Sequence, residues 1–176
     1  MGEEVYKQLC ETMARRGGRY PGVDIPEFYE MARVLFTPEE AEVSNTLPKG
    51  FNPVSVIAKE MGKDEKEVAT ILETMADKGL CTSSKAGDTT VYAGPPFMVG
   101  IFEYQFMRGT NTERDKEIAK AIHAYKEAVD TGKGPPVITF PTTRVIPVDR
   151  KIKAGNVQFT PMTRSNPISS DMSPWP

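Results

Sequence analysis

The sequence predicts a mainly α-helical protein with a small β-sheet and an extended, proline-rich C-terminal arm. Apolar residues recur with helical spacing through most of residues 1–132, in runs that open on residues typical of helix starts. Only one pair of neighbouring runs, within residues 80–93, has the composition of strands. Eight of the 15 prolines lie in residues 133–176, where they exclude a long helix.

The composition is that of a folded protein without a membrane segment. The 176 residues are enough for one compact domain with ordered appendages. A hydrophobic fraction of 39% and a charged fraction of 26% are typical of globular rather than disordered chains. No stretch is apolar enough to span a membrane, and the N-terminus lacks an apolar secretion segment. We therefore expect a cytoplasmic protein that makes no membrane contact.

Residues 1–48 are expected to form three short helices. The first run has one apolar face and ends at a pair of glycines. Asp24 and Thr37 each precede a proline and an acidic residue, an arrangement of cap, first-turn proline and acid that is typical of a helix start. The three helices are predicted over residues 3–15, 25–35 and 38–46.

Residues 49–94 begin with two helices joined by a short turn. Asn52-Pro53 is typical of a helix cap, and the apolar positions that follow predict a helix ending at Gly62. Asp64 opens a second helix, in which apolar residues recur at i, i+3, i+4 and i+7 up to Gly79.

Two runs with the composition of strands follow these helices, at residues 80–84 and 89–93. Between them, residues 85–88 include a glycine suited to a positive φ, so the runs predict a β-hairpin. Helix, tight turn, helix and hairpin, in this order, predict a winged helix-turn-helix over residues 49–94.

Residues 95–132 predict further helices packed on the winged helix. The first, over residues 97–107, is apolar on nearly all sides, which indicates burial, a partner surface or both. Thr110 and Glu113 can form a capping box for an amphipathic helix over residues 112–130. Residues 133–176 are expected to form an extended and flexible arm.

The residues that carry most enzyme chemistry are scarce. The two cysteines, Cys10 and Cys81, form no CxxC pair, so neither a zinc ribbon nor an iron–sulfur site is predicted, and both are expected to be buried apolar residues. A catalytic triad would have to use His123, which lies in the charged amphipathic helix. The glycine clusters lack a phosphate-binding pattern. We expect no catalytic residue, no metal ligand and no cofactor in this chain, and no enzyme activity.

A DNA-binding transcriptional regulator is the alternative hypothesis. A DNA-reading helix needs Arg, Lys, Asn or Gln on its exposed face. Residues 64–78 instead carry five acidic residues against Lys66 and Lys78, and the net charge of the chain is −2. DNA is therefore the less favoured partner, and this alternative also predicts dimerisation through residues 97–130. Its contact residues would be Lys63, Lys66, Thr70 and Lys85.

A non-catalytic protein-interaction module is the preferred hypothesis. Residues 1–132 hold 16 Lys/Arg against 22 Asp/Glu, whereas residues 133–176 hold 6 against 2, so the folded part is acidic and the arm is basic. An extended arm can cover a large surface of a partner. The contact surface is expected in the aromatic stretch 97–107 and the arm 137–160, at Phe97, Phe102, Tyr104, Phe106, Phe140, Arg144 and Ile146.

Four segments carry a family resemblance that covers about residues 3–153. They are LFTPEEAEV, VIAKEMGKDEKEVATILETMADKGL, PPFMVGIFEYQ and TTRVIPVDRKI. In this order they resemble the region that precedes the cluster-binding part of bacterial and archaeal 4Fe-4S ferredoxin-domain proteins. The resemblance implies electron transfer with redox partners, yet no cysteine follows Ile152, so the cluster ligands of that family have no counterpart here.

This resemblance implies an accessory subunit, or a truncated N-terminal part, of an iron–sulfur redox protein. The 4Fe-4S clusters would then lie on a partner or on a missing C-terminal domain. The expected partner is a redox protein or a ferredoxin-like subunit, and a homodimer is a further expectation.

Overall fold

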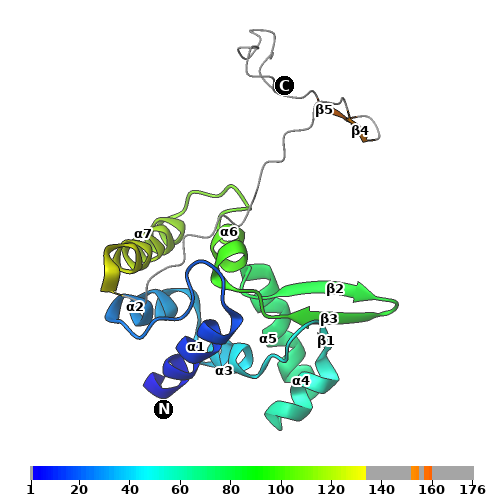
Figure 1. Ribbon diagram of the computed structural model, residues 1–176. Helices are drawn as coiled ribbons and strands as arrows, with labels where there is room; N and C mark the ends of the chain where they lie inside the picture. The colour runs from blue at the N-terminus through cyan, green and yellow to red at the C-terminus, as the bar shows by residue number, and fades with distance from the viewer. Residues whose placement is uncertain (1, 134–151, 155–156, 160–176) are drawn as a thin grey trace. The chain divides into compact units, whose positions relative to one another are not determined.

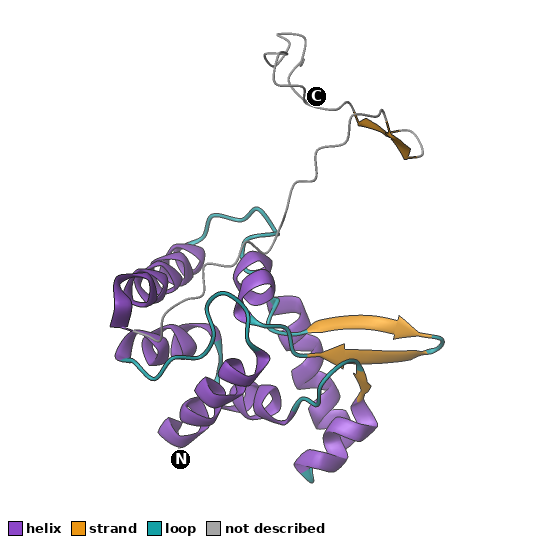
Figure 2. Cartoon of the chain, in the orientation of Figure 1, coloured by secondary structure: helices purple, strands orange, loops and turns teal. Residues whose placement is uncertain are grey.

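The computed structural model of the protein describes residues 2–133, 152–154 and 157–159 (Figure 1). The chain divides into two units, residues 1–138 and residues 139–176, and each is described by itself. The first unit is mainly helical and contains one small antiparallel sheet (Figure 2). This confirms the general fold class that the sequence predicts.

The three expected N-terminal helices are present as α1 (Gly2–Arg16), α2 (Pro26–Leu35) and α3 (Pro38–Thr46). The capping box of α3 is as predicted, because the Thr37 side chain accepts from the Glu40 amide and the Glu40 carboxylate accepts from the Thr37 amide. Asp24, in contrast, does not cap α2. Its carboxylate accepts a 2.7 Å hydrogen bond from the hydroxyl of Tyr29, and Ile25 occupies the cap position.

The next two helices are α4 (Val54–Met61) and α5 (Glu65–Lys78). The Asp64 side chain caps α5 as predicted, since it accepts from two amides of the first turn. The predicted cap at Asn52-Pro53 is wrong. These two residues form a short strand, β1, and Pro53 precedes α4 without a side-chain cap.

The predicted hairpin is present as β2 (Thr82–Ala86) and β3 (Thr89–Ala93). Its loop contains only the two residues between these strands, Gly87 and Asp88, instead of the expected four, and Gly87 has the expected positive φ of 61°. Strand β1 pairs with the other edge of β3, so the strand order is β1-β3-β2 (Figure 2). Strand β2 therefore lies at one edge of the sheet.

The expected helix over residues 97–107 begins later than predicted. Met98 and Val99 have extended backbone angles, and regular helix is confined to α6 (Phe102–Tyr104), after the irregular helical segment η1 (Phe97–Ile101). The carboxylate of Glu103 accepts a 2.7 Å hydrogen bond from the amide of Gly100, which satisfies the backbone at the helix start.

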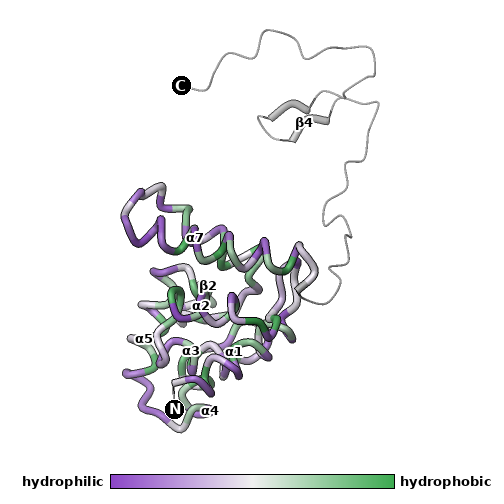
Figure 3. Tube along the Cα trace, turned by 90° about the vertical axis from the view of Figure 1, so that its left-hand side faces the viewer, coloured by the Kyte–Doolittle hydropathy of each residue, from purple (hydrophilic) through white to green (hydrophobic). Residues whose placement is uncertain are grey.

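The last α-helix among the described residues of this unit is α7 (Glu113–Ala128), followed by the turn η2 (Val129–Lys133). It begins with a capping box formed by Thr112 and Asp115, so the box predicted for Thr110 and Glu113 is wrong. Hydrophobic and hydrophilic positions alternate along α7 (Figure 3), and its apolar face is buried against α2.

The core contains a cluster of aromatic rings. Phe97 stacks on Phe102 with ring centroids 5.1 Å apart, and Phe28 and Tyr125 contact Phe97 at 6.0 and 6.3 Å. Three segments that are distant in sequence, at α2, η1–α6 and α7, are joined by these contacts. Cys10 and Cys81 are both buried, as the sequence predicts, and neither forms a disulfide.

The described part of the second unit is an antiparallel hairpin of β4 (Ile152–Ala154) and β5 (Val157–Phe159). The sequence predicts only an extended arm there. The predicted contact residues Phe140, Arg144 and Ile146 lie outside the described residues. Among the described helices, none has the length and hydrophobicity needed to cross a membrane.

Candidate protein-docking surface

Two adjacent apolar side chains that follow α6 are exposed to solvent. Phe106 is 43% exposed and Met107 is 75% exposed. Met107 borders a cavity of about 450 Å³ between the end of α5, the start of β2 and the turn that follows α6. We call this surface the Met107 face; it consists of Phe106 together with the cavity residues Asp77, Gly79, Thr82, Ser83, Tyr104, Met107 and Arg108.

Close packing holds the Met107 face in place. Gly79 ends α5 with a φ of 75°, and a Cβ at this position would lie 2.7 Å from the Cβ of Tyr104. The absence of a side chain at Gly79 therefore lets α5 and the α6 turn approach each other directly.

Side chains of the α6 turn also pair with the last carbonyl groups of α5. The Gln105 amide donates a 2.9 Å hydrogen bond to the carbonyl of Lys78, and the guanidinium of Arg108 donates to the carbonyl of Asp77. Carbonyl groups at a helix C-terminus lack partners within the helix, so these bonds join the two elements. Met107 thus lies on a turn whose backbone is held in place by these hydrogen bonds.

A second cavity of about 280 Å³ adjoins the Met107 face. It shares Asp77, Tyr104 and Arg108 with the first cavity and extends to the start of α7, where Arg114 and Asp115 lie. The charges around the two cavities have both signs. The site thus combines an exposed apolar centre with a charged border, which is the general anatomy of a protein interface.

The aromatic residues proposed from the sequence separate into two groups. Phe97 is 1% exposed and Phe102 is 5% exposed, because both belong to the aromatic cluster of the core. Neither presents a surface to a partner. Tyr104 is half-buried and lines both cavities, and Phe106 is exposed.

Sequence reasoning did not identify Arg108, Asp77 or the start of β2 as parts of this surface. They meet only through the packing of α6 on α5. Which side chains of this segment are exposed depends on where the helix begins. The helix expected over residues 97–107 begins too early, so it did not predict that Met107 is exposed.

Three of the four residues proposed for DNA contact, Lys63, Thr70 and Lys85, have side-chain hydrogen-bond partners within the chain. Lys63 forms a 2.7 Å ion pair with Glu42, and this hydrogen bond raises the pKa of Lys63. The Lys85 ammonium donates to the hydroxyl of Thr90 at 2.8 Å, and the hydroxyl of Thr70 donates to the carbonyl of Lys66 at 3.0 Å. Of these residues, Lys63 has its positive charge balanced by a carboxylate.

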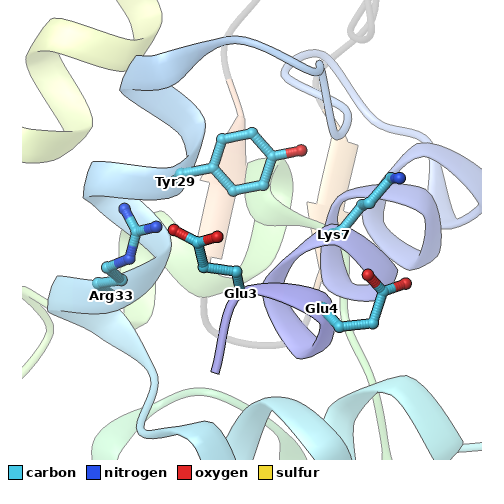
Figure 4. A pocket seen from close by; sticks show the side chains of 5 residues that line it. All are labelled: Glu3, Glu4, Lys7, Tyr29 and Arg33. Atoms are coloured by element: carbon cyan, nitrogen blue, oxygen red, sulfur yellow. The ribbon is translucent and has the colours of Figure 1, made fainter. Parts of the chain in front are cut away.

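A third cavity of about 410 Å³ lies between α1 and α2 (Figure 4). It is lined by Glu3, Glu4 and Lys7 of α1 and by Tyr29 and Arg33 of α2, and the Glu3 side chain extends toward Tyr29 and Arg33. Burial, together with the hydrogen bond to Asp24, raises the pKa of Tyr29. A neutral phenol among charges of both signs is not an activated nucleophile.

The buried thiols are also poorly suited to covalent chemistry. Burial raises the pKa of Cys10 to about 11 and that of Cys81 to about 12. Both are neutral at pH 7, whereas the thiolate is the reactive form and the metal ligand. Within the described ranges, no group of three or more His, Cys, Asp and Glu side chains is arranged to hold a metal ion.

Comparison with known proteins finds no relative: no protein-family model matches the chain, and no curated protein or solved structure matches it significantly.

Proposed function

We propose that this chain is a non-catalytic protein-interaction module built on a winged helix-turn-helix. The element order α3-β1-α4-α5-β2-β3 and the strand order β1-β3-β2 support this fold, with β2 and β3 as the wing. The tight turn from α4 to α5 at Gly62 has the left-handed φ of 63° that such a connection uses.

The proposed interaction function rests mainly on the Met107 face. An exposed apolar pair beside a cavity, held by a rigid turn and bordered by charges, is suited to receiving an apolar side chain of a partner. Because the turn is already positioned by Gly79, Gln105 and Arg108, little ordering of the backbone is required on binding.

The proposed partner is an iron–sulfur redox protein or a ferredoxin-like subunit. This part of the proposal rests on the family resemblance of the sequence and on the lack of cluster ligands in the chain itself. The clusters would lie on the partner, and this chain would act as its accessory subunit.

The test is purification of the tagged full chain from its host without oxygen, followed by measurement of iron and of the bound protein. We expect an iron–sulfur protein in equal amount with the chain. The variant F106S/M107S should lose this protein, whereas the control F51S/V99S should retain it, since Phe51 and Val99 are 55% and 71% exposed but lie outside the cavity. Equal recovery with both variants, or recovery of no iron, would contradict the proposal.

The second candidate function is DNA binding, which the helix-turn-helix order favours. The acidic residues of α5 are exposed and oppose this function because they repel phosphates. Under this alternative, duplex DNA binds with an affinity that falls steeply with salt, and K63A/K66A/K85A weakens binding. Salt-independent or undetectable binding would exclude it.

A further inference from the structure

Strand β2 presents an open edge of the sheet in the first unit. The strand order β1-β3-β2 leaves one side of β2 without a neighbouring strand among the described residues. Ser83, Ser84, Lys85 and Ala86 are all exposed. Such an edge offers unpaired backbone donors and acceptors to another extended chain.

The two-residue loop of the hairpin determines which backbone groups point outward. Ala86 and Thr89 flank this loop and pair with each other, so they form the hydrogen-bonded pair that closes the turn. Hydrogen-bonded and non-hydrogen-bonded pairs alternate in an antiparallel ladder. Ser83 and Lys85 therefore direct their N–H and C=O groups away from β3.

We propose that a second copy of this chain adds to this edge through its own β2, antiparallel, about a two-fold axis at Ser84. In this register Ser83 lies opposite the partner's Lys85, and both residues have outward backbone groups. Four backbone hydrogen bonds can form between the copies. The proposal goes beyond the docking function above and does not rest on it.

The neighbouring registers are less favourable. A shift of the axis to a position between two residues pairs an outward backbone group with an inward one, so the ladder cannot form. An axis at Lys85 places two lysines directly opposite each other, which is destabilising. An axis at Ser83 leaves fewer strand residues paired, since β2 begins at Thr82.

Charges on the sheet support pairing in the proposed register. Ser83 pairs with Tyr92, so both lie on the same face of the sheet as Lys85. At Ser83 this face is turned toward the end of α5, because Tyr92 is buried and Ser83 lines the cavity together with Asp77. The partner's Lys85, opposite Ser83, therefore comes close to the cavity that Asp77 and Arg108 both line.

A second charge pair arises at the tip of the hairpin. Thr82 lies opposite the partner's Ala86, so the partner's Asp88 lies beyond the start of β2, on the side where Arg108 and Thr82 border the cavity. A lysine on an edge strand usually opposes the addition of another strand. Here Asp77 borders the cavity beside Ser83 and offers the partner's Lys85 a charge of opposite sign. The pairing also uses the same edge of both copies, so the assembly stops at two.

The test measures the mass of the full chain by sedimentation equilibrium over a range of concentrations. S83P removes an outward N–H that β3 does not use, whereas the control S83A keeps it. We expect the wild type and S83A to reach twice the mass of one chain, and S83P to dissociate at least about tenfold more readily, since two hydrogen bonds are lost per dimer. Unchanged melting temperature in S83P would show that the hairpin itself is intact.

Charge reversal provides a second, independent measurement. K85E should weaken the dimer and D77K/K85E should restore it, because the pair is then reversed in sign. A wild type that stays a single chain at all concentrations overturns the proposal, as does an S83P variant that associates as well as S83A. The sedimentation measurement uses the purified chain without any other protein, so its outcome is independent of the recovery of an iron–sulfur partner, which tests the docking function.

Discussion

The guanidinium of Arg16 donates two hydrogen bonds to Ser44, one to the side-chain hydroxyl at 3.1 Å and one to the backbone carbonyl at 2.7 Å. Ser44 lies in the last turn of α3, where carbonyl groups lack partners within the helix. Arg16 thus joins the end of α1 to the end of α3. Burial lowers the pKa of Arg16 to about 10, so it stays charged at pH 7.

Replacing Arg16 is expected to destabilise the first unit. R16M keeps most of the apolar stem but leaves the buried Ser44 without its donor, which costs about 1–3 kcal/mol of unfolding free energy. G94A should also destabilise the protein, because a Cβ at Gly94 would overlap the guanidinium. Chemical denaturation measures both effects. In R16M/G94A the total loss of unfolding free energy should be smaller than the sum of the two single losses, because the guanidinium that the new Cβ would overlap is absent. A total loss equal to that sum would contradict a contact between Gly94 and Arg16.

The ion pair between Lys78 and Glu40 links the end of α5 to the start of α3 at 2.6 Å. Glu40 is almost completely buried, so K78M leaves its carboxylate without a cation and should cost about 1–3 kcal/mol. K116M is the matched control, since the Lys116–Glu113 pair is exposed and should contribute about 0.5 kcal/mol or less. Similar losses in urea denaturation of the two variants would contradict this assignment.

Gly79 and Gly62 end two successive helices in the left-handed conformation, but their surroundings differ. G62A should cost about 1 kcal/mol, because only the positive φ opposes a side chain there. G79A should cost clearly more, since its Cβ would also displace Tyr104. Thermal denaturation compares the two variants. In addition, G79A should disturb the Met107 face, which a change in the fluorescence of Tyr104 can report.

The aromatic stretch is expected to respond to substitution in two different ways. F97A opens a cavity in the aromatic cluster and should cost about 3–5 kcal/mol. F106A removes a side chain that is 43% exposed and should cost about 0.5 kcal/mol or less. Denaturant midpoints measure the difference. A mild effect of F97A would show that Phe97 does not belong to the core.

Stability should fall as the pH rises above about 9 because of the buried thiols. An ordinary cysteine in the unfolded chain loses its proton near pH 9, whereas the pKa is raised to about 11 for Cys10 and to about 12 for Cys81 in the folded chain. Between these values the folded state binds more protons, so the unfolding free energy decreases with pH. The slope between pH 9 and 10 should become smaller in C10A/C81A. An unchanged slope would mean that other groups cause the loss.

Local signals in the sequence were sufficient for most of the helices and for the hairpin. The Thr37 capping box, the Asp64 cap and the glycines after α4 and α5 depend on residues only a few positions apart, and such interactions form in the same way in many folds. Where local alternatives competed, the prediction was wrong. Asp24 could cap α2 or accept from Tyr29, and the tertiary position of Tyr29 selected the second.

The sequence by itself determined the helices α1 to α5 and α7, the β2–β3 hairpin, and that the two cysteines are buried. The tertiary structure alone decided that Phe97 is in the core, where it packs against rings of α2 and α7, while Met107 is exposed on the turn that follows α6. It also decided that β1 adds to the hairpin and leaves β2 at the edge. Contacts between distant segments depend on how side chains pack in three dimensions. Hydrophobic periodicity and helix caps in the sequence do not predict which residues meet in this way.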